Sequence, residues 1–289
     1  MRYAIKLGPY ADHADPRRLA ALAHDAEVAG WDGFFVWDAM LHDGYGLPKP
    51  DPWIALAAIA MCTERLRLGP MITPLARRRP WKVAREAATL DHLSGGRLIL
   101  GVGLGDPSDE EFGWFGEPTD YRVRARMLDE SLRILDGLWS GQPFSYQGEF
   151  YTLHEMTFLP RPVQRPRIPI WCGGWWPNKP PMRRAARWDG VQPGKLSGPL
   201  TPQEVREMVA YIMAHRADAA PFDVAVPGVT PGDDPAGGAA LVAPFIEAGA
   251  TWWIEDCGPD SFAHAPDAQD GPWPIAAIER RIRQGPPRV

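Results

Sequence analysis

Two glycine-rich segments are the first places where this sequence could hold a ligand. Residues 101–106 read Gly-Val-Gly-Leu-Gly-Asp, and residues 172–175 read Cys-Gly-Gly-Trp. Glycine at the end of a strand lets a flat ring or a phosphate come close to the backbone. A dinucleotide fingerprint needs the spacing G-x-G-x-x-G, whereas the first run is G-x-G-x-G followed by acids that would repel a pyrophosphate. These glycines either hold another kind of cofactor or only form tight turns.

Arginines follow the second segment and also gather at residues 77–79. A Gly-Gly pair before a helix offers free N–H donors and a favourable dipole for a phosphate, and nearby arginines could clamp an anion. The alternative is that these arginines form solvated surfaces. For Arg184 we favour the solvated surface, and for the others both interpretations stay open.

Asp38 and His42 are the candidate acid–base residues. Asp38 ends the apolar run 33–37, where a carboxylate is costly to desolvate unless it serves a ligand or a neighbouring donor. A histidine near a cavity can move protons at neutral pH because its ordinary pKa is near 6.5. Cys172 lacks an identifiable neighbouring base, so we expect it to be an inert buried thiol.

No self-sufficient catalytic set is visible beside these residues. The sequence has no Gly-x-Ser-x-Gly elbow, no His-Glu-x-x-His motif and no grouped Cys or His ligands, so we expect no metal site. A cofactor is therefore expected to carry the chemistry.

The elements that must position these residues alternate along the chain. Short apolar runs separated by amphipathic helical patterns indicate eight strands and a parallel sheet. Several helices begin at an Asp or Thr followed by Pro, at residues 15, 51, 201 and 234. We expect a single-domain (β/α)8 TIM barrel over residues 1–289 with short insertions. An open, doubly wound sheet is the alternative. In such a barrel, the active site lies at the C-terminal ends of the strands. The strands are expected at residues 3–7, 33–37, 66–68, 97–102, 168–172, 190–192, 222–226 and 251–255.

Composition narrows the class of protein. The 289 residues carry a formal charge of −5, and 45% of them are hydrophobic. No apolar run approaches the roughly 18 residues that span a bilayer, and the absence of a long Lys/Arg stretch argues against a nucleic-acid partner. The N-terminus is too short and too charged for a signal peptide. We expect a cytoplasmic enzyme with a small-molecule substrate and no membrane partner.

An ordered series of motifs resembles one known family over nearly the whole chain. The motifs are Leu68-Gly69-Pro70-Met71-Ile72-Thr73-Pro74, Arg79-Pro80, residues 89–97 (Thr-Leu-Asp-His-Leu-Ser-Gly-Gly-Arg), Leu100-Gly101-Val102-Gly103, residues 138–141 (Leu-Trp-Ser-Gly), Tyr146-x-Gly148, residues 169–174 (Pro-Ile-Trp-x-Gly-Gly) and residues 184–190 (Arg-Ala-Ala-Arg-Trp-Asp-Gly). With these motifs in this order, the chain resembles the bacterial-luciferase-like flavin-dependent oxidoreductases and monooxygenases.

The resemblance implies a TIM barrel, a homodimer, and FMN or the deazaflavin coenzyme F-420 in the barrel mouth. It also implies a cis non-prolyl peptide behind the ring, which by position would join Pro70 and Met71. The remaining cofactor-binding residues that it implies are Ile72 and Thr73 beside the ring, Gly103, Leu104, Gly105 and Asp106 on the pyrimidine or ribityl side, and Gly173 and Gly174 at the phosphate. Asp38, through a polar contact, and Trp175 complete the expected cofactor-binding set.

One position departs from the family pattern. The family commonly has a His directly after the acid that ends the second strand, and here Ala39 follows Asp38 while His42 lies further on. The first hypothesis is therefore a monooxygenase that uses reduced FMN and oxygen on a small organic substrate. The alternatives are an F-420-dependent reductase or dehydrogenase, and a non-catalytic flavin-binding barrel.

Overall fold

A nine-stranded parallel sheet runs through the chain. We analysed a computed structural model that describes residues 1–41, 46–258, 261 and 273–288. Its strands are β1 (Arg2–Leu7), β2 (Gly33–Val36), β3 (Arg67–Pro70), β4 (Thr73–Pro74), β5 (Leu100–Gly103), β8 (Ile170–Trp175), β9 (Gly190–Gly194), β10 (Asp223–Gly228) and β11 (Trp252–Cys257). Neighbours in the sheet follow the order β3-β2-β1-β11-β10-β9-β8-β5-β4.

The sheet closes into a barrel because β3 and β4 are two pieces of one strand. Leu68 in β3 forms a parallel bridge with Leu98, and the Ile99 N–H donates to the Leu68 carbonyl at 2.9 Å. The β4 piece pairs with β5 in parallel, with Thr73 opposite Val102. Counted this way the ring has eight strand positions, and the predicted (β/α)8 barrel is confirmed.

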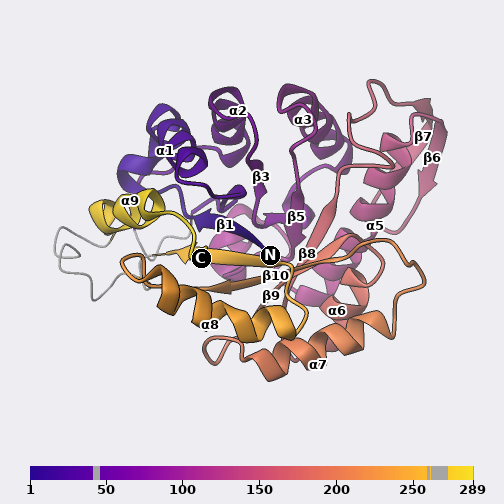
Figure 1. Cartoon of the computed structure of the whole chain (residues 1–289). Helices are drawn as coiled ribbons and strands as arrows, with labels where there is room; N and C mark the ends of the chain where they lie inside the picture. Colours follow the sequence, from indigo (N-terminus) through magenta and orange to yellow (C-terminus); the bar gives the residue numbers. More distant parts are fainter. Residues whose placement is uncertain (42–45, 259–260, 262–272, 289) are drawn as a thin grey trace.

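Helices surround the strands, as Figure 1 shows. Each strand position is followed by at least one helix, and β5 is followed by an insertion that ends in an antiparallel hairpin. The elements are α1 (Pro16–Val28), α2 (Pro52–Cys62), α3 (Pro80–Leu93), α4 (Ser108–Glu111), α5 (Tyr121–Trp139), β6 (Pro143–Gln147), β7 (Thr152–Thr157), α6 (Lys179–Ala185), α7 (Pro202–Met213), α8 (Pro235–Glu247) and α9 (Ile275–Gln284), with short 3-10 helices at Ala11–Ala14, Leu75–Arg77 and Gly113–Phe115.

The four predicted Asp/Thr-Pro helix starts are all present. Asp15, Asp51, Thr201 and Asp234 each accept a backbone N–H from the first turn of their helix, with Pro directly after them. A carboxylate or hydroxyl there satisfies a donor that the helix itself leaves free. The spacing Ser108-x-x-Glu111 also predicts a capping box, and this prediction is wrong: Glu111 is buried and accepts the backbone N–H groups of Met40 and Leu41 instead.

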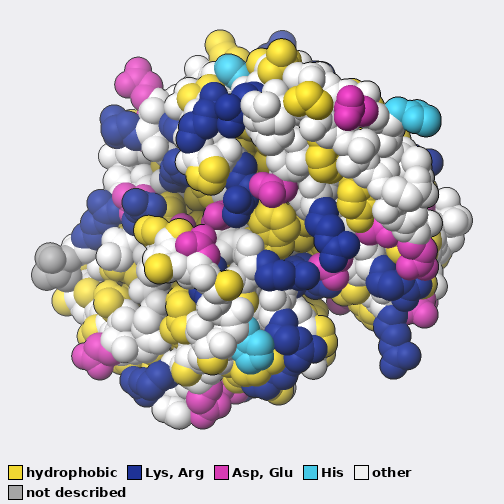
Figure 2. All heavy atoms as spheres, turned by 90° about the vertical axis from the view of Figure 1, so that its right-hand side faces the viewer, with side chains coloured by type: hydrophobic (Ala, Val, Ile, Leu, Met, Phe, Trp, Pro, Cys, Tyr) yellow, Lys and Arg dark blue, Asp and Glu magenta, His cyan; other side chains and the backbone are white. Residues whose placement is uncertain are grey.

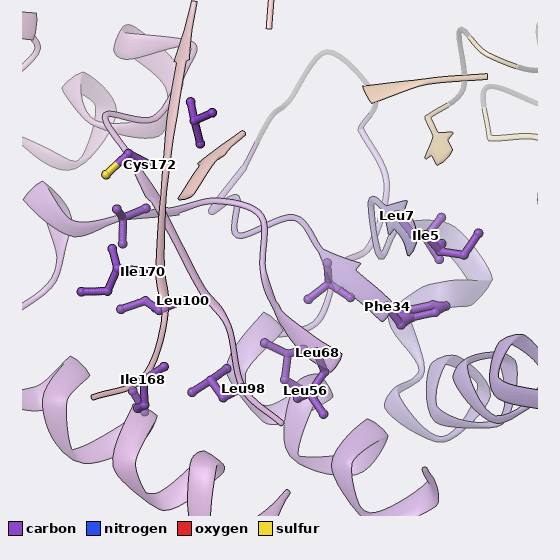
Figure 3. Packing of buried hydrophobic residues seen from close by; sticks show 14 of the residues in the cluster. Ile5, Leu7, Phe34, Leu56, Leu68, Leu98, Leu100, Ile168, Ile170 and Cys172 are labelled. Atoms are coloured by element: carbon purple, nitrogen blue, oxygen red, sulfur yellow. The ribbon is translucent and has the colours of Figure 1, made fainter. Parts of the chain in front are cut away.

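Two apolar layers hold the barrel together. The larger layer lies between the strands and the helices, and Figure 3 shows part of it, with Ile5, Leu68 and Ile170 among the packed side chains. The smaller layer fills the barrel interior. There Phe35, Trp171 and Trp252 contact one another with ring centroids 5.3 to 6.3 Å apart. We call these three side chains the aromatic floor, because they close the interior below the strand ends.

The surface mixes charges of both signs. On the face drawn in Figure 2, Lys and Arg side chains lie among Asp and Glu side chains and apolar side chains. Exposed ion pairs such as Arg126–Glu149 contribute to this pattern. In the described part of the chain, no helix has both the length and the apolar character needed to cross a membrane.

Candidate active site at the barrel mouth

The C-terminal ends of the strands form the mouth of the barrel. Side chains alternate along a strand, so the positions that share a face with the aromatic floor point inward. Ile72, which follows β3, packs against the interior cluster. The inward positions near the C-terminal ends of the described strands are Lys6, Trp37, Gly103, Gly173, Trp175, Gln192, Gly194, Pro227 and Asp256.

The third strand breaks at a cis peptide bond, but one residue later than expected. The bond joins Met71 and Ile72, not Pro70 and Met71. The Met71 N–H still donates to the Val36 carbonyl at 2.8 Å, so the β2–β3 ladder continues through Met71 and the chain departs from it only afterwards. Thr73 and Pro74 then return to the sheet as β4.

Two of the predicted glycines lie beneath Ile72. A Cβ added at Gly103 would stand 2.7 Å from the Ile72 Cδ1 atom, and one at Gly173 would stand 3.1 Å from its Cγ2 atom. Any larger residue at Gly103 would therefore displace Ile72. The structure brings Ile72, Gly103 and Gly173 together from three separate strand ends, and we call this group the glycine platform.

Gly174 and Trp175 are placed differently from Gly173. Both belong to β8, which runs further than predicted, and a Cβ at Gly174 would meet the Pro181 Cβ of α6 at 2.3 Å. Gly174 therefore permits close packing of α6 against the strand. Trp175 ends the strand with 43% of its surface exposed. The sequence also offers Trp37, Trp175, Trp176, Trp252 and Trp253 as an aromatic rim for the substrate, or alternatively as core residues. Of these, Trp176, Trp252 and Trp253 are buried.

The loop after β5 is held by a buried arginine. Arg124 donates to the carbonyls of Leu104 and Gly105 at 3.1 and 3.2 Å. Gly105 has φ +79°, a conformation that glycine adopts without strain. Asp106 is exposed and accepts a hydrogen bond from the Tyr121 hydroxyl at 2.7 Å.

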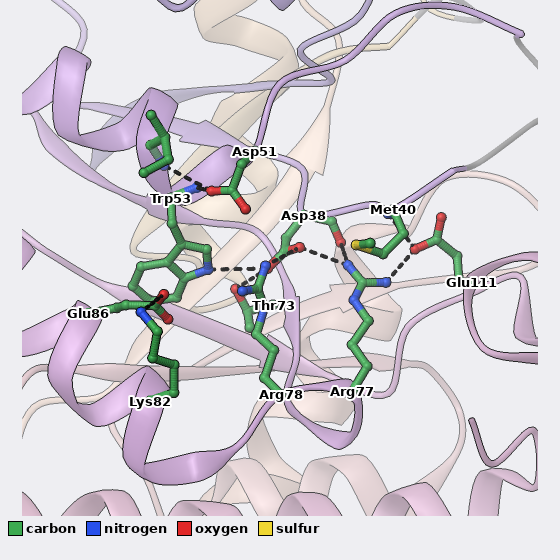
Figure 4. Close-up of polar contacts among 11 residues, drawn as sticks. Asp38, Met40, Asp51, Trp53, Thr73, Arg77, Arg78, Lys82, Glu86 and Glu111 are labelled. Carbon is green, nitrogen blue, oxygen red and sulfur yellow. Dashed lines mark hydrogen bonds and ion pairs between the residues drawn. The ribbon is translucent and has the colours of Figure 1, made fainter. Parts of the chain in front are cut away.

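Asp38 is surrounded by donors, as Figure 4 shows. Arg77 donates to its Oδ1 atom at 2.7 Å, and Arg78 lies 2.9 Å from Oδ2. The Thr73 hydroxyl donates to Oδ2 at 2.8 Å, and the Trp53 indole N–H does so at 3.3 Å. The Asp38 side chain is only 1% exposed. The structure therefore supplies the neighbouring donors that a buried acid at this position requires.

Arg77 also connects Asp38 to the loop after β5. Its second nitrogen binds Glu111, and the Glu111 carboxylate accepts the backbone N–H groups of Met40 and Leu41 at 2.8 and 2.9 Å. We call Asp38, Arg77, Arg78 and Glu111 the buried charge cluster. Two carboxylates face two guanidinium groups, so its formal charges cancel.

This environment keeps Asp38 ionised. Burial opposes ionisation, but the charges of Arg78 and Arg77, together with hydrogen bonds from Arg78 and Thr73, lower the pKa of Asp38 below its ordinary value. A carboxylate so engaged is a weak base with no free lone pair directed at the mouth. Neither Arg77 nor Arg78 serves as an anion clamp, because both are bound to these carboxylates.

Sequence reasoning missed Glu111 as a partner of this cluster. The acidic residues next to Glu111 in the sequence indicate a short helix, and no sequence spacing links Glu111 to Arg77. Arg184, which we expected on a solvated surface, is buried and binds Asp129 at 2.8 Å.

The remaining candidates are simpler to place. His42 lies outside the described residues. Burial raises the pKa of the Cys172 thiol to about 12, which agrees with the expected inert role. Among the residues that the structure describes, no group of three His, Cys, Asp or Glu side chains could hold a metal ion.

Comparisons with known proteins place this architecture in a family. Residues 3–282 match the family described as luciferase-like monooxygenase. The chain is 34% identical over 171 residues to an F-420-dependent glucose-6-phosphate dehydrogenase of Nakamurella multipartita, covering 58% of this chain and 49% of that protein. It therefore spans about half the length of that curated relative. It is also 32% identical to an uncharacterized protein of Mycobacterium tuberculosis, covering 71% of this chain and 74% of that protein.

Solved structures agree on the fold. The coenzyme F-420-dependent tetrahydromethanopterin reductase of Methanopyrus kandleri superposes with a TM-score of 0.74 at 19% identity, covering 98% of both chains. A monooxygenase of Streptomyces bottropensis superposes with a TM-score of 0.64 at 23% identity, covering 99% of this chain and 91% of that one. The chain belongs to the luciferase-like monooxygenase family of oxidoreductases.

Proposed function

We propose that this chain is an oxidoreductase that transfers a hydride between a small organic substrate and the deazaflavin coenzyme F-420 bound in the barrel mouth. The observation that carries the proposal is the glycine platform: an uncharged surface of Ile72, Gly103 and Gly173 above an aromatic floor. The identity to F-420-dependent dehydrogenases supports the choice of cofactor.

The residues at the mouth fit a flat ring system. Added Cβ atoms at Gly103 and Gly173 would stand within 3.1 Å of Ile72, so the platform stays shallow only because these positions are glycine. The backbone of residues 70–73 and the side chain of Ile72 would support the ring on one side. Leu104 and Gly105 would line its edge. The exposed Asp106 carboxylate and the exposed Trp175 indole could meet the cofactor's substituents.

A bound deazaflavin supplies hydride transfer, whereas bound reduced FMN supplies oxygen activation. The chain's own contribution is to position a substrate against the ring and to exclude water from the aromatic floor. Asp38 contributes indirectly: the buried charge cluster fixes the loops after β2, β4 and β5 around the barrel mouth. It is a positioning residue in this proposal.

An FMN-dependent monooxygenase is the second candidate. The family description and the monooxygenase fold neighbour favour it, as does Ala39, which stands where F-420-dependent relatives commonly place a His.

Titration of the purified protein with F-420, FMN and reduced FMN tests the two candidates. Quenching of tryptophan fluorescence reports binding, and absorbance reports reduction of F-420 or oxidation of reduced FMN in air. Binding of F-420 with reduction by an alcohol or aldehyde donor supports the proposal. Tight binding of reduced FMN with substrate-dependent oxygen use supports the second candidate. Binding without turnover of any donor supports a non-catalytic flavin-binding barrel.

A further inference from the structure

A second ion pair lies at the barrel mouth, separate from the buried charge cluster. The Lys6 Nζ atom lies 2.8 Å from the Asp256 Oδ2 atom, and the two side chains are 14% and 30% exposed. We propose that Lys6 and Asp256 bind the hydroxyl group of a neutral alcohol substrate and that Asp256 accepts its proton during oxidation. This inference rests on the proposed hydride-transfer function and assigns the substrate class and the base for it.

The register of the sheet directs both side chains into the barrel. Lys6 pairs with Asp256 across β1 and β11. Lys6 comes two residues after Ala4, and Asp256 comes two residues after Ile254, and both of these residues belong to the interior cluster. Because strand side chains alternate, Lys6 and Asp256 point the same way. The pair lies two inward positions beyond Trp252, toward the C-terminal ends of the strands, and Lys6 stands opposite Phe35 in the register of β1 with β2.

The pair has unused hydrogen-bonding capacity. The Asp256 Oδ1 atom is buried and has no hydrogen-bond partner among the described residues. A buried carboxylate oxygen can only accept, so what it lacks is a donor. Lys6 has three N–H groups, of which Asp256 takes one, and its Nζ atom lies 5.8 Å from the centre of a Trp37 ring. A donor and an acceptor are therefore available side by side.

A neutral hydroxyl group matches this arrangement. Its O–H can donate to Asp256 Oδ1 while its oxygen accepts from Lys6. The pair has no net charge, so an anionic group such as a phosphate ester would meet the Asp256 carboxylate as well as the Lys6 ammonium group. The aromatic floor below gives an apolar remainder of the substrate a surface to pack on.

On the described strands, no other inward residue near the mouth can take the proton. The remaining inward positions there are Trp37, Gly103, Gly173, Trp175, Gln192, Gly194 and Pro227, and none of these has an ionisable side chain that could act as a base. Asp38 is engaged by Arg77, Arg78, Thr73 and Trp53. Among the inward positions of the described strands, Asp256 has a carboxylate oxygen that lacks a hydrogen-bond partner.

The step balances with the oxidised deazaflavin as hydride acceptor. The C–H bond at the carbinol carbon breaks, and its hydrogen leaves with both electrons to the cofactor. The O–H bond breaks, and its proton passes to Asp256 Oδ1 while the C=O bond forms. Lys6 then donates a hydrogen bond to the carbonyl oxygen of the product, and the partly exposed Asp256 returns the proton to solvent.

The test uses 1-phenylethanol as the neutral probe and glucose 6-phosphate as the anionic one. Asp256→Asn keeps the shape and an acceptor oxygen but cannot hold the proton, so kcat should fall by about 100-fold while KM stays within about threefold. Lys6→Met removes the donor, so KM should rise by about 10-fold. Affinity for F-420, followed by tryptophan fluorescence, should stay within about twofold in both variants, because neither side chain belongs to the glycine platform.

Lys82→Met and Glu86→Gln are the matched controls. These residues form a Lys–Glu pair at 2.7 Å on α3. Neither control should change kcat or KM. Wild-type kcat in Asp256→Asn, with F-420 bound, would overturn the role of the pair and leave the proposed function standing. Preferred turnover of glucose 6-phosphate that depends on Lys6 but not on Asp256 would also overturn it.

A second readout needs no cofactor. Saturation-transfer NMR of the cofactor-free protein should show binding of 1-phenylethanol in the wild type and in both controls, and a loss of this signal in Lys6→Met. If neither F-420 nor FMN binds while this pattern holds, the proposed function fails and the hydroxyl site stands. Equal signals in the wild type and Lys6→Met, or no signal in either, would overturn the site.

Discussion

At the scale of single residues, Asp38 is a structural anion. We expect Asp38→Asn to lower the free energy of unfolding by about 3 kcal/mol, because Arg77 and Arg78 would lose the charge that neutralises them in a buried place. Urea denaturation measures the change. Asp12→Asn is the control, since it breaks an exposed pair with Arg18 that we expect to contribute little. Unchanged stability combined with slower turnover in Asp38→Asn would contradict the structural role and indicate that Asp38 takes part in the reaction.

The lowered pKa of the Asp38 carboxylate leads us to expect a lower free energy of unfolding in acid. The pKa of Asp38 is lower in the folded chain than the ordinary value of 3.8. A group of this kind contributes its full stability above the unfolded-state pKa, and the contribution is lost as the pH falls through the folded-state pKa. As the pH falls below about 5, where carboxylates begin to bind protons, we expect the free energy of unfolding to decrease more in the wild type than in Asp38→Asn. Parallel pH profiles of urea midpoints for the two proteins would contradict this.

The sequence predicts these residues unevenly, for physical reasons. Asp38 at a buried strand end requires donors, and this argument is confirmed. Glu111 could not be found, because pairing across loops depends on the closed barrel and not on spacing along the chain. Lys6 and Asp256 were not predicted. Lys6 is a charged residue within an otherwise apolar run, which is a signal that one strand face is polar at the mouth, whereas Asp256 directly follows Glu255 and carries no such signal.

At the scale of elements, Gly174 governs how α6 packs on β8. We expect Gly174→Val to lower the free energy of unfolding by about 2 kcal/mol, because its side chain would overlap Pro181, with Met182 close behind. Gly173→Ala should be milder, since its Cβ would meet only Ile72 and the Val102 carbonyl at 3.1 to 3.3 Å. Thermal unfolding of both variants measures the difference. Native stability in Gly174→Val combined with lost cofactor binding would instead make Gly174 a ligand contact.

Elements with local signals were predicted most accurately. Helical periodicity predicts helices over residues 52–62, 80–93 and 121–139, and the bounds of α2, α3 and α5 agree with these ranges. The split of the third strand into β3 and β4 was not expected from apolar runs, because it depends on a backbone turn between Met71 and Thr73. Ring closure through Leu68 and Leu98 likewise follows from the whole sheet and from no single segment.

At the scale of the whole molecule, the exposed apolar face of α2 indicates how two copies of the chain would associate. The helix has no charged residue, and its outer face exposes Ile54 at 66% and Met61 at 69%. An α-helix that is apolar on every side is typical of a buried position. The homodimer that the family resemblance implies would bury this face against the same face of a second copy, as a two-fold interface requires.

We therefore expect wild-type chain to sediment as a dimer and the double variant Ile54→Glu with Met61→Glu to sediment as a monomer at the same concentration. Two carboxylates on each copy would face each other across the two-fold axis and would lose water on association. Leu241→Glu is the control, because Leu241 is exposed on α8, on the opposite side of the barrel in Figure 1. Analytical ultracentrifugation distinguishes the states. A wild-type monomer, or a dimer that persists in the double variant and dissociates in Leu241→Glu, would place the interface elsewhere.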